Sequence, residues 1–388
     1  MTGVAIRFPK THDMRLGMKI EYIGISDERK EEAQIRLCIK SGSANDVAGK
    51  EGTAHLLEHI NLLFDKLGKY GSRNDLKATG YTDFFNTTYV FDTVDDAIHI
   101  YRVFEIINRI IDGWFINQYD INLAKQDIKK EISEIDVNPI VKKIIEGSQL
   151  ERKDPRNKQV NVDNITIDDI YQYLHKNYEK NNCLILIESG LPRQEIEEGA
   201  ELLFPCREDA VKDNSIFLNW NDFNYKESKN VKGIIFKLKK TTEQYGNGFW
   251  EVKWIQWILE QCFIDMCKGT PDGVEISEML FSPYEFLFGI FDDSIYWNEN
   301  IKEKIGGMLK GCLDKKTKDS CYQILISRAK SDRILNQILV REKEYIYNRK
   351  LILNDWDDVF QQINEMNIHK MIKYFEEILY NENILLLD

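Results

Sequence analysis

The chain has 388 residues, of which 43% are hydrophobic and 30% are charged, and its formal net charge is −12. This length is enough for two domains with a core each, and the composition is that of a globular protein. The negative charge disfavours nucleic acid and anionic lipid as partners, because both bind basic surfaces.

The sequence shows no segment that is typical of membrane insertion or export. No apolar run reaches the length of a membrane span, and residues 1–10 lack the apolar stretch of a signal peptide. The seven cysteines have no framework spacing, which fits reduced thiols. We therefore expect a cytoplasmic protein with no membrane span.

The first two hundred residues alternate strand-like and helix-like patterns. Alternating or β-branched residues predict strands at residues 19–25, 34–40, 79–92 and 183–188. Helical spacing predicts helices that begin near Thr53 and that cover residues 95–111, 121–135 and 163–178, the last capped by Asn164 or Thr166. Strands and helices in this mixed order predict an α+β fold.

The second half repeats this order only loosely. Residues 203–230, polar and interrupted by Pro205, predict a linker. Beyond it, the patterns predict strands at 231–238, within 282–292 and at 384–387, and helices at 248–267 and over much of 298–380. We therefore predict an N-terminal domain at residues 1–205, a linker at 206–230 and a C-terminal domain at 231–388.

The most informative stretch is Gly-Thr-Ala-His-Leu-Leu-Glu-His, from Gly52 to His59. On a helix, His55 and His59 lie one turn apart and can reach one metal ion, while Glu58 lies on the same face. A carboxylate there can act as a base toward water, and a catalytic zinc requires a third ligand from elsewhere. Alone, the pattern fits a polar helix face equally well, but two of only six histidines fall within it.

Five blocks extend the motif in both directions. They are RLCIKSGSAN (36–45), GTAHLLEHINLLF (52–64), TGYTDFFNTTYVF (79–91), KKEISEIDVNP (129–139) and DNITIDDIYQYLHKNYEKNNCLILIESG (163–190). In this order, residues 16–191 resemble the N-terminal half of a pitrilysin/insulinase zinc peptidase, a family that includes mitochondrial processing peptidase. The resemblance implies two related α/β-sandwich domains of the mitochondrial processing peptidase type, the second shortened, and one zinc per chain.

The resemblance also implies roles for the residues of the motif. It makes His55 and His59 metal ligands and Glu58 the catalytic base. The third ligand is Glu131, which precedes an isoleucine and stands eight residues before a proline, as in the family; Glu134, one turn later, is the competitor. The family has an acidic residue two turns before this ligand, and Ala124 stands at that position in this sequence.

Family members bind a peptide as an added strand, which places the substrate along residues 81–86. The asparagine of the family's edge strand falls at Thr79. The expected substrate-binding residues are Thr79, Tyr81, Thr82, Asp83, Phe84 and, in the second half, Tyr284. The simpler interpretation is that the aromatic and β-branched residues among them pack a sheet.

The second half departs from the family, because no arginine has the spacing of the Arg/Tyr pair that holds the substrate carbonyl. The chain thus resembles the zinc-bearing subunit of a two-chain bacterial member. We predict a zinc-dependent endopeptidase for short or unfolded peptides, such as a maturing precursor peptide, that works as a heterodimer with a second family-related subunit or as a homodimer. The alternatives are a catalytically silent scaffold subunit and a different zinc hydrolase that shares only the motif.

Overall fold

A computed structural model describes residues 19–24, 32–68, 75–134, 151–156, 162–204, 233–239, 275–282, 285–291, 303, 307 and 384–387. The chain divides into two compact units. One contains residues 9–137 and 149–216, and the other contains residues 1–8, 138–148 and 217–388. The predicted linker at residues 206–230 and the domain boundaries beside it lie outside the described residues.

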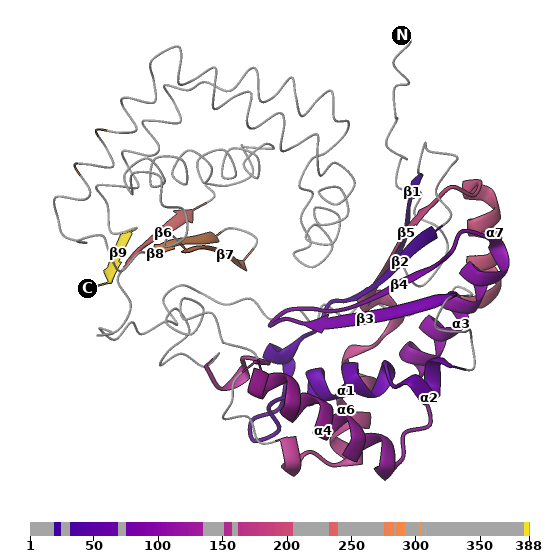
Figure 1. The fold of residues 1–388 in the computed structure, drawn as a ribbon, viewed down its shortest axis with the longest axis horizontal. Helices are drawn as coiled ribbons and strands as arrows, with labels where there is room; N and C mark the ends of the chain where they lie inside the picture. Colours follow the sequence, from indigo (N-terminus) through magenta and orange to yellow (C-terminus); the bar gives the residue numbers. More distant parts are fainter. Residues whose placement is uncertain are drawn as a thin grey trace, which may run out of the picture. The chain divides into compact units, whose positions relative to one another are not determined.

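The first unit is built on a five-stranded sheet. Its strand order is β1 (Lys19–Gly24), β5 (Cys183–Ser189), β2 (Glu32–Ile39), β4 (Thr87–Val94) and β3 (Leu76–Thr82). β1 and β5 are parallel and the other pairs are antiparallel. β3 is therefore the last strand of the described sheet, and it pairs there with β4 alone (Figure 1).

The single strand predicted at residues 79–92 is a hairpin. β3 ends at Thr82 and β4 begins at Thr87. In the turn between them the Asp83 N–H donates to the Asn86 carbonyl at 2.8 Å, and the Phe84 N–H donates to Asp83 Oδ1 at 2.7 Å. The sequence predicted one continuous strand because the turn contains aromatic residues, which favour strands. The local signal for the turn is Asp83, whose side chain accepts a hydrogen bond from the N–H of the next residue.

The described helices of this unit gather along one face of the sheet (Figure 1). α1 (Thr53–Asn61) contacts β3 and β4 and is packed by α4 (Gln118–Glu134) and α6 (Ile167–Asn177). α3 (Ala97–Asp112) lies against β2 and β4 and carries α7 (Arg193–Leu203), a helix that was not predicted. α2 (Phe64–Leu67) is a single turn after α1. Among the described helices, none is long and apolar enough to cross a bilayer.

The core of this unit lies between the sheet and these helices. β5 is buried at every position, and the side chains of Tyr89, Phe91 and Phe104 are fully buried. Local signals also agree with the elements: Thr166 rather than Asn164 caps α6, through a reciprocal capping box with Asp169. The apolar periodicity and the caps together explain why these helices start and pack where they do.

The second unit contains a four-stranded antiparallel sheet in the order β7 (Glu275–Ser282), β8 (Glu285–Phe291), β6 (Gly233–Lys239) and β9 (Ile384–Leu387). The strands predicted at 231–238 and 384–387 correspond to β6 and β9, and the segment 282–292 contains β8. β7 was not predicted. The helices predicted at 248–267 and within 298–380 lie outside the described residues. The predicted α+β class is confirmed.

Candidate metal centre and catalytic base

The first turn of α1 is held by Asp46. Its carboxylate accepts hydrogen bonds from the Gly52 N–H at 2.7 Å and the Ala54 N–H at 3.0 Å. Burial raises the pKa of Asp46 to about 7, against the effect of these two N–H groups. Gly52 has a φ of 92°, a left-handed conformation that favours glycine. These contacts at the start of α1 determine how the helix is rotated about its axis, and therefore which way its histidines point.

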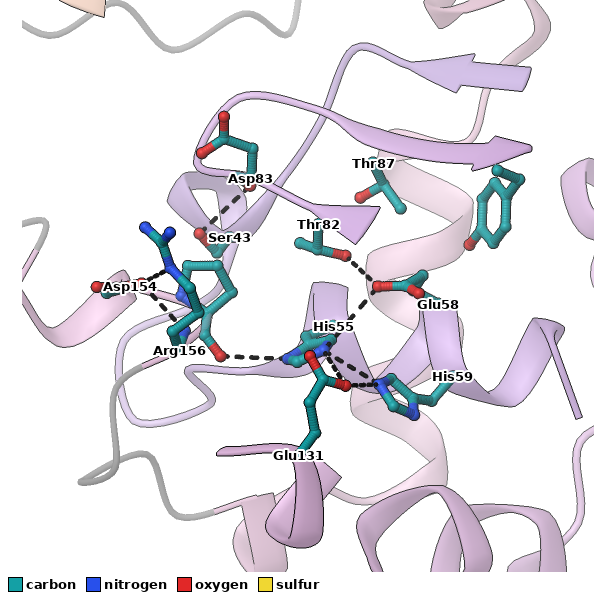
Figure 2. Close-up of polar contacts among 12 residues, drawn as sticks. Ser43, His55, Glu58, His59, Thr82, Asp83, Thr87, Glu131, Asp154 and Arg156 are labelled. Atoms are coloured by element: carbon teal, nitrogen blue, oxygen red, sulfur yellow. Dashed lines mark hydrogen bonds and ion pairs between the residues drawn. The ribbon is translucent and has the colours of Figure 1, made fainter. Parts of the chain in front are cut away.

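His55 and His59 project from α1 and Glu131 from α4 toward one point, as Figure 2 shows. The two Nε2 atoms of the histidines lie 3.1 Å apart. Glu131 Oε2 lies 3.0 Å from His59 Nε2 and 3.7 Å from His55 Nε2. Glu134 is exposed and has no contact with either imidazole in the described structure. The structure therefore brings the three predicted ligands together and leaves the competitor outside.

These three atoms fit a tetrahedral zinc ion. Zinc bonds of 2.0–2.1 Å in tetrahedral geometry place neighbouring ligand atoms about 3.3 Å apart, and the three separations here are 3.0, 3.1 and 3.7 Å. Two imidazole nitrogens that face each other repel through their lone pairs unless a proton or a cation lies between them. Two imidazoles and one carboxylate are also a usual donor set for catalytic zinc.

Glu58 lies beside this triangle rather than in it. The residue is 4% exposed, and its Oε2 atom lies 4.0 Å from His55 Nε2, farther than Glu131 Oε2 does. The same oxygen accepts a hydrogen bond from Thr82 Oγ1 at 3.0 Å (Figure 2). The ligand atoms of Glu58 and the two histidines all lie within 4.8 Å of one another. The position suits a base that acts next to a metal without binding it.

The surroundings shift the pKa values of the two carboxyl groups in opposite directions. Burial raises the pKa of Glu58, which strengthens it as a proton acceptor. Hydrogen bonding to His55 and His59 lowers the pKa of Glu131 well below its usual range and keeps it anionic. Burial would lower the pKa of His55, but Glu131 and Glu58 outweigh it and raise that pKa. The site therefore attracts positive charge.

His55 is oriented by the backbone of a segment that the sequence did not single out. Its Nδ1 atom lies 3.2 Å from the Pro155 carbonyl oxygen, so this nitrogen carries the proton and Nε2 keeps its lone pair for a metal. Lys153 Nζ ties the same segment to the Ala44 carbonyl oxygen at 2.5 Å. Ala124, which replaces the family's acidic residue, is fully buried in the core. No side-chain pattern could reveal a carbonyl in this role.

The expected substrate-binding residues separate into different environments. Thr79 and Tyr81 are exposed on β3, whereas Thr82 turns to the opposite side and contacts Glu58. The Asp83 carbonyl accepts a hydrogen bond from the Ser43 N–H at 3.0 Å. Phe84 is 0% exposed, so its side chain packs in the core and cannot reach a peptide there. Tyr284 lies outside the described residues.

The geometry makes a prediction about the third ligand. Glu131→Gln should weaken zinc binding by a factor of ten or more, because it removes the anionic oxygen 3.0 Å from His59 Nε2. Glu134→Gln removes the same charge from the same helix and should leave the zinc affinity unchanged. Competition with a chelator of known affinity measures both. Equal losses in the two variants would contradict the assignment.

Comparison with known proteins relates the chain to peptidases. Residues 22–160 match the insulinase family, peptidase family M16. The probable zinc protease PqqL of Haemophilus influenzae is 22% identical over 206 residues, which is 48% of this chain and 22% of that protein. The match thus spans about a fifth of the curated relative's length.

Solved structures share the fold. The first half of the periplasmic protease PqqL from Escherichia coli has a TM-score of 0.72 at 12% identity, over 98% of this chain and 92% of that one. A protease from Helicobacter pylori has a TM-score of 0.71 at 16% identity, over 97% and 98% of the two chains. Against the whole E. coli PqqL the TM-score is 0.71 at 12% identity, and the match covers 98% of this chain but 48% of that protein.

Proposed function

We propose that this chain, whose residues 22–160 match the insulinase family of peptidases, is a zinc-dependent endopeptidase that cleaves short or unfolded peptides. The observation that carries the proposal is the convergence of His55, His59 and Glu131 on one point, with the buried carboxylate of Glu58 beside it. A polar helix face or a structural ion pair would not require two imidazoles and a carboxylate to face one point.

The geometry supports the following roles for the residues. Zinc, held by His55, His59 and Glu131, would supply Lewis acidity to the scissile carbonyl and to water. Glu58 takes a proton from the water molecule whose oxygen attacks the carbonyl carbon. It then gives this proton to the amide nitrogen as the carbon–nitrogen bond breaks. Burial raises the pKa of Glu58, which favours its acceptance of the proton from water.

The substrate would bind along β3. This strand pairs only with β4 in the described sheet, so the backbone N–H and C=O groups of its other edge can pair with a peptide. Such pairing requires an extended segment, which favours short or unfolded substrates over folded proteins. Lys77, Thr79 and Tyr81 alternate on the exposed face of the strand and would contact side chains of the peptide.

We further propose that catalysis needs a second, family-related subunit. The sequence offers no arginine spaced as in the family's Arg/Tyr pair. The chain also corresponds to about half of the full-length E. coli PqqL, whose first half it resembles. A second family-related chain, in a heterodimer or a homodimer, would supply the Arg/Tyr pair. Maturation of a small precursor peptide is the process that we propose for such an assembly.

The test compares the chain with and without a partner. The zinc-loaded chain alone should be nearly inactive on a mixed peptide library, because correct positioning of the scissile bond lowers the barrier of a peptidase by several kcal/mol (about 7 kcal/mol or more in favourable cases). A second family-related chain from the same source should restore cleavage, and a chelator should abolish it. Robust cleavage by the isolated monomer would refute the need for a partner. Zinc binding without cleavage in any combination would favour the silent scaffold.

A further inference from the structure

We propose that Thr82 and Gly80, both on β3, hold the carboxylate of Glu58 in place, so that the last strand of the described sheet also positions the catalytic base. The catalytic meaning of this inference rests on the proposed function. The contact itself rests on the geometry of β3 and α1 and can be tested separately.

The first contact is a hydrogen bond. Thr82 Oγ1 donates to Glu58 Oε2 at 3.0 Å, and Glu58 is 4% exposed. A buried carboxylate has little water to replace a lost donor, so this bond favours one orientation of the side chain. It is the only hydrogen bond to the Glu58 carboxylate from another side chain in the described part of the chain.

The second contact is steric. A Cβ atom placed on Gly80 would lie 2.7 Å from Glu58 Oε1 and 2.8 Å from Leu62 Cδ1. Real Cβ atoms do not approach other atoms so closely, so the carboxylate occupies the space that any other residue at position 80 would fill. Thr82 thus directs one carboxylate oxygen and Gly80 leaves room for the other.

The two residues act from a rigid frame. Gly80 and Thr82 are two positions apart, so they face the same side of β3, and they pair with Tyr89 and Thr87 of β4. The Tyr89 hydroxyl accepts a hydrogen bond from Asn61 Nδ2 at 2.9 Å at the end of α1. The hairpin is therefore fastened to the helix that carries Glu58 by a second, fully buried contact.

This arrangement links substrate binding to catalysis. A peptide that pairs with β3 would be anchored to the same strand that orients the base. The distance between the scissile bond and Glu58 would then depend on one short strand rather than on two independent elements. We infer that Thr82 and Gly80 are positioning residues: they act on turnover through Glu58 and make no contact with the metal.

The contact can be tested without activity. Thr82→Val removes the hydroxyl at nearly constant shape, and its effect on the melting temperature should largely disappear when Glu58 is already alanine, because the two residues form one interaction. Thr93→Val is the matched control: Thr93 donates to the Asp75 carbonyl at the other end of the hairpin. Its effect should be the same with or without Glu58. Additive effects of Thr82→Val and Glu58→Ala would overturn the proposed contact.

The role in catalysis needs a kinetic readout in the assembly that cleaves peptide. Thr82→Val should lower kcat by roughly 10- to 100-fold, as loss of an orienting partner does, with little change in KM or zinc affinity. Thr82→Ser should recover most of this loss, and Gly80→Ala should reproduce it by displacing the carboxylate. Thr93→Val should leave kcat unchanged.

The outcomes are separable. Unchanged kcat in both Thr82→Val and Gly80→Ala would refute positioning of the base, even if the contact is real. A loss that appears in KM alone would show that these residues act on peptide binding instead. If the wild-type assembly cleaves nothing, the proposed function fails, while the melting measurements still decide whether Thr82 holds Glu58.

Discussion

A Glu58→Gln variant should retain one zinc per chain and lose about a thousandfold in kcat, which is within the range for removal of a general base. The amide has the shape of the carboxylate, and its oxygen can still accept the hydrogen bond from Thr82. It cannot take a proton from water. In activation free energy the loss corresponds to about 4 kcal/mol.

The structure explains why metal and turnover should separate in this variant. Glu58 Oε2 lies 4.0 Å from His55 Nε2, whereas the separations within the predicted ligand triangle do not exceed 3.7 Å. The measurement is kcat together with zinc content on the same preparation. Glu134→Gln, with the same change of charge at an exposed position of α4, is the control and should behave as wild type. A metal-loaded Glu58→Gln protein with full activity would refute the mechanism.

Much of the site could be predicted because its information is local. The spacing of His55 and His59 on one helical turn determines that both point the same way, whatever surrounds the helix. The register of Glu131 against Ile132 and Pro139 distinguished it from Glu134, and the structure places only Glu131 against the imidazoles. The resemblance to the insulinase family is confirmed by the match over residues 22–160.

The parts that could not be predicted depend on contacts between distant segments. The Pro155 carbonyl reaches His55 across a hundred residues and is a backbone group, which leaves no trace in a side-chain pattern. Thr82 stays a predicted substrate contact, but its hydrogen bond to Glu58 was not predicted, because it joins two segments that are distant in the sequence. The turn within residues 79–92 was missed because Phe84 reads as a strand residue although its ring fills the core.

Removal of either histidine should abolish stoichiometric zinc. His55→Ala or His59→Ala leaves one imidazole and one carboxylate, too few for a catalytic zinc site, and the zinc content after dialysis should fall from about one per chain to less than about a tenth. The loss should be equal in both variants, because the two Nε2 atoms lie 3.1 Å apart and would share one ion. Elemental analysis measures the bound metal.

A loss of zinc could also follow from misfolding, since His55 is 5% exposed and the Pro155 carbonyl depends on it for a hydrogen-bond donor. Thermal unfolding separates the two causes. Zinc should raise the melting temperature of the wild type, because a ligand that binds only the folded state stabilises it. It should not raise that of His59→Ala, whose less buried position makes it the gentler substitution (side-chain exposure 18% against 7% for His55).

The control is His99→Ala, which removes an imidazole paired with Asp96 on α3. This variant should keep both the bound zinc and the zinc-dependent rise in melting temperature. If both folded site variants kept stoichiometric zinc, the metal would have to bind away from α1. The convergence of the three ligand atoms would then have no function.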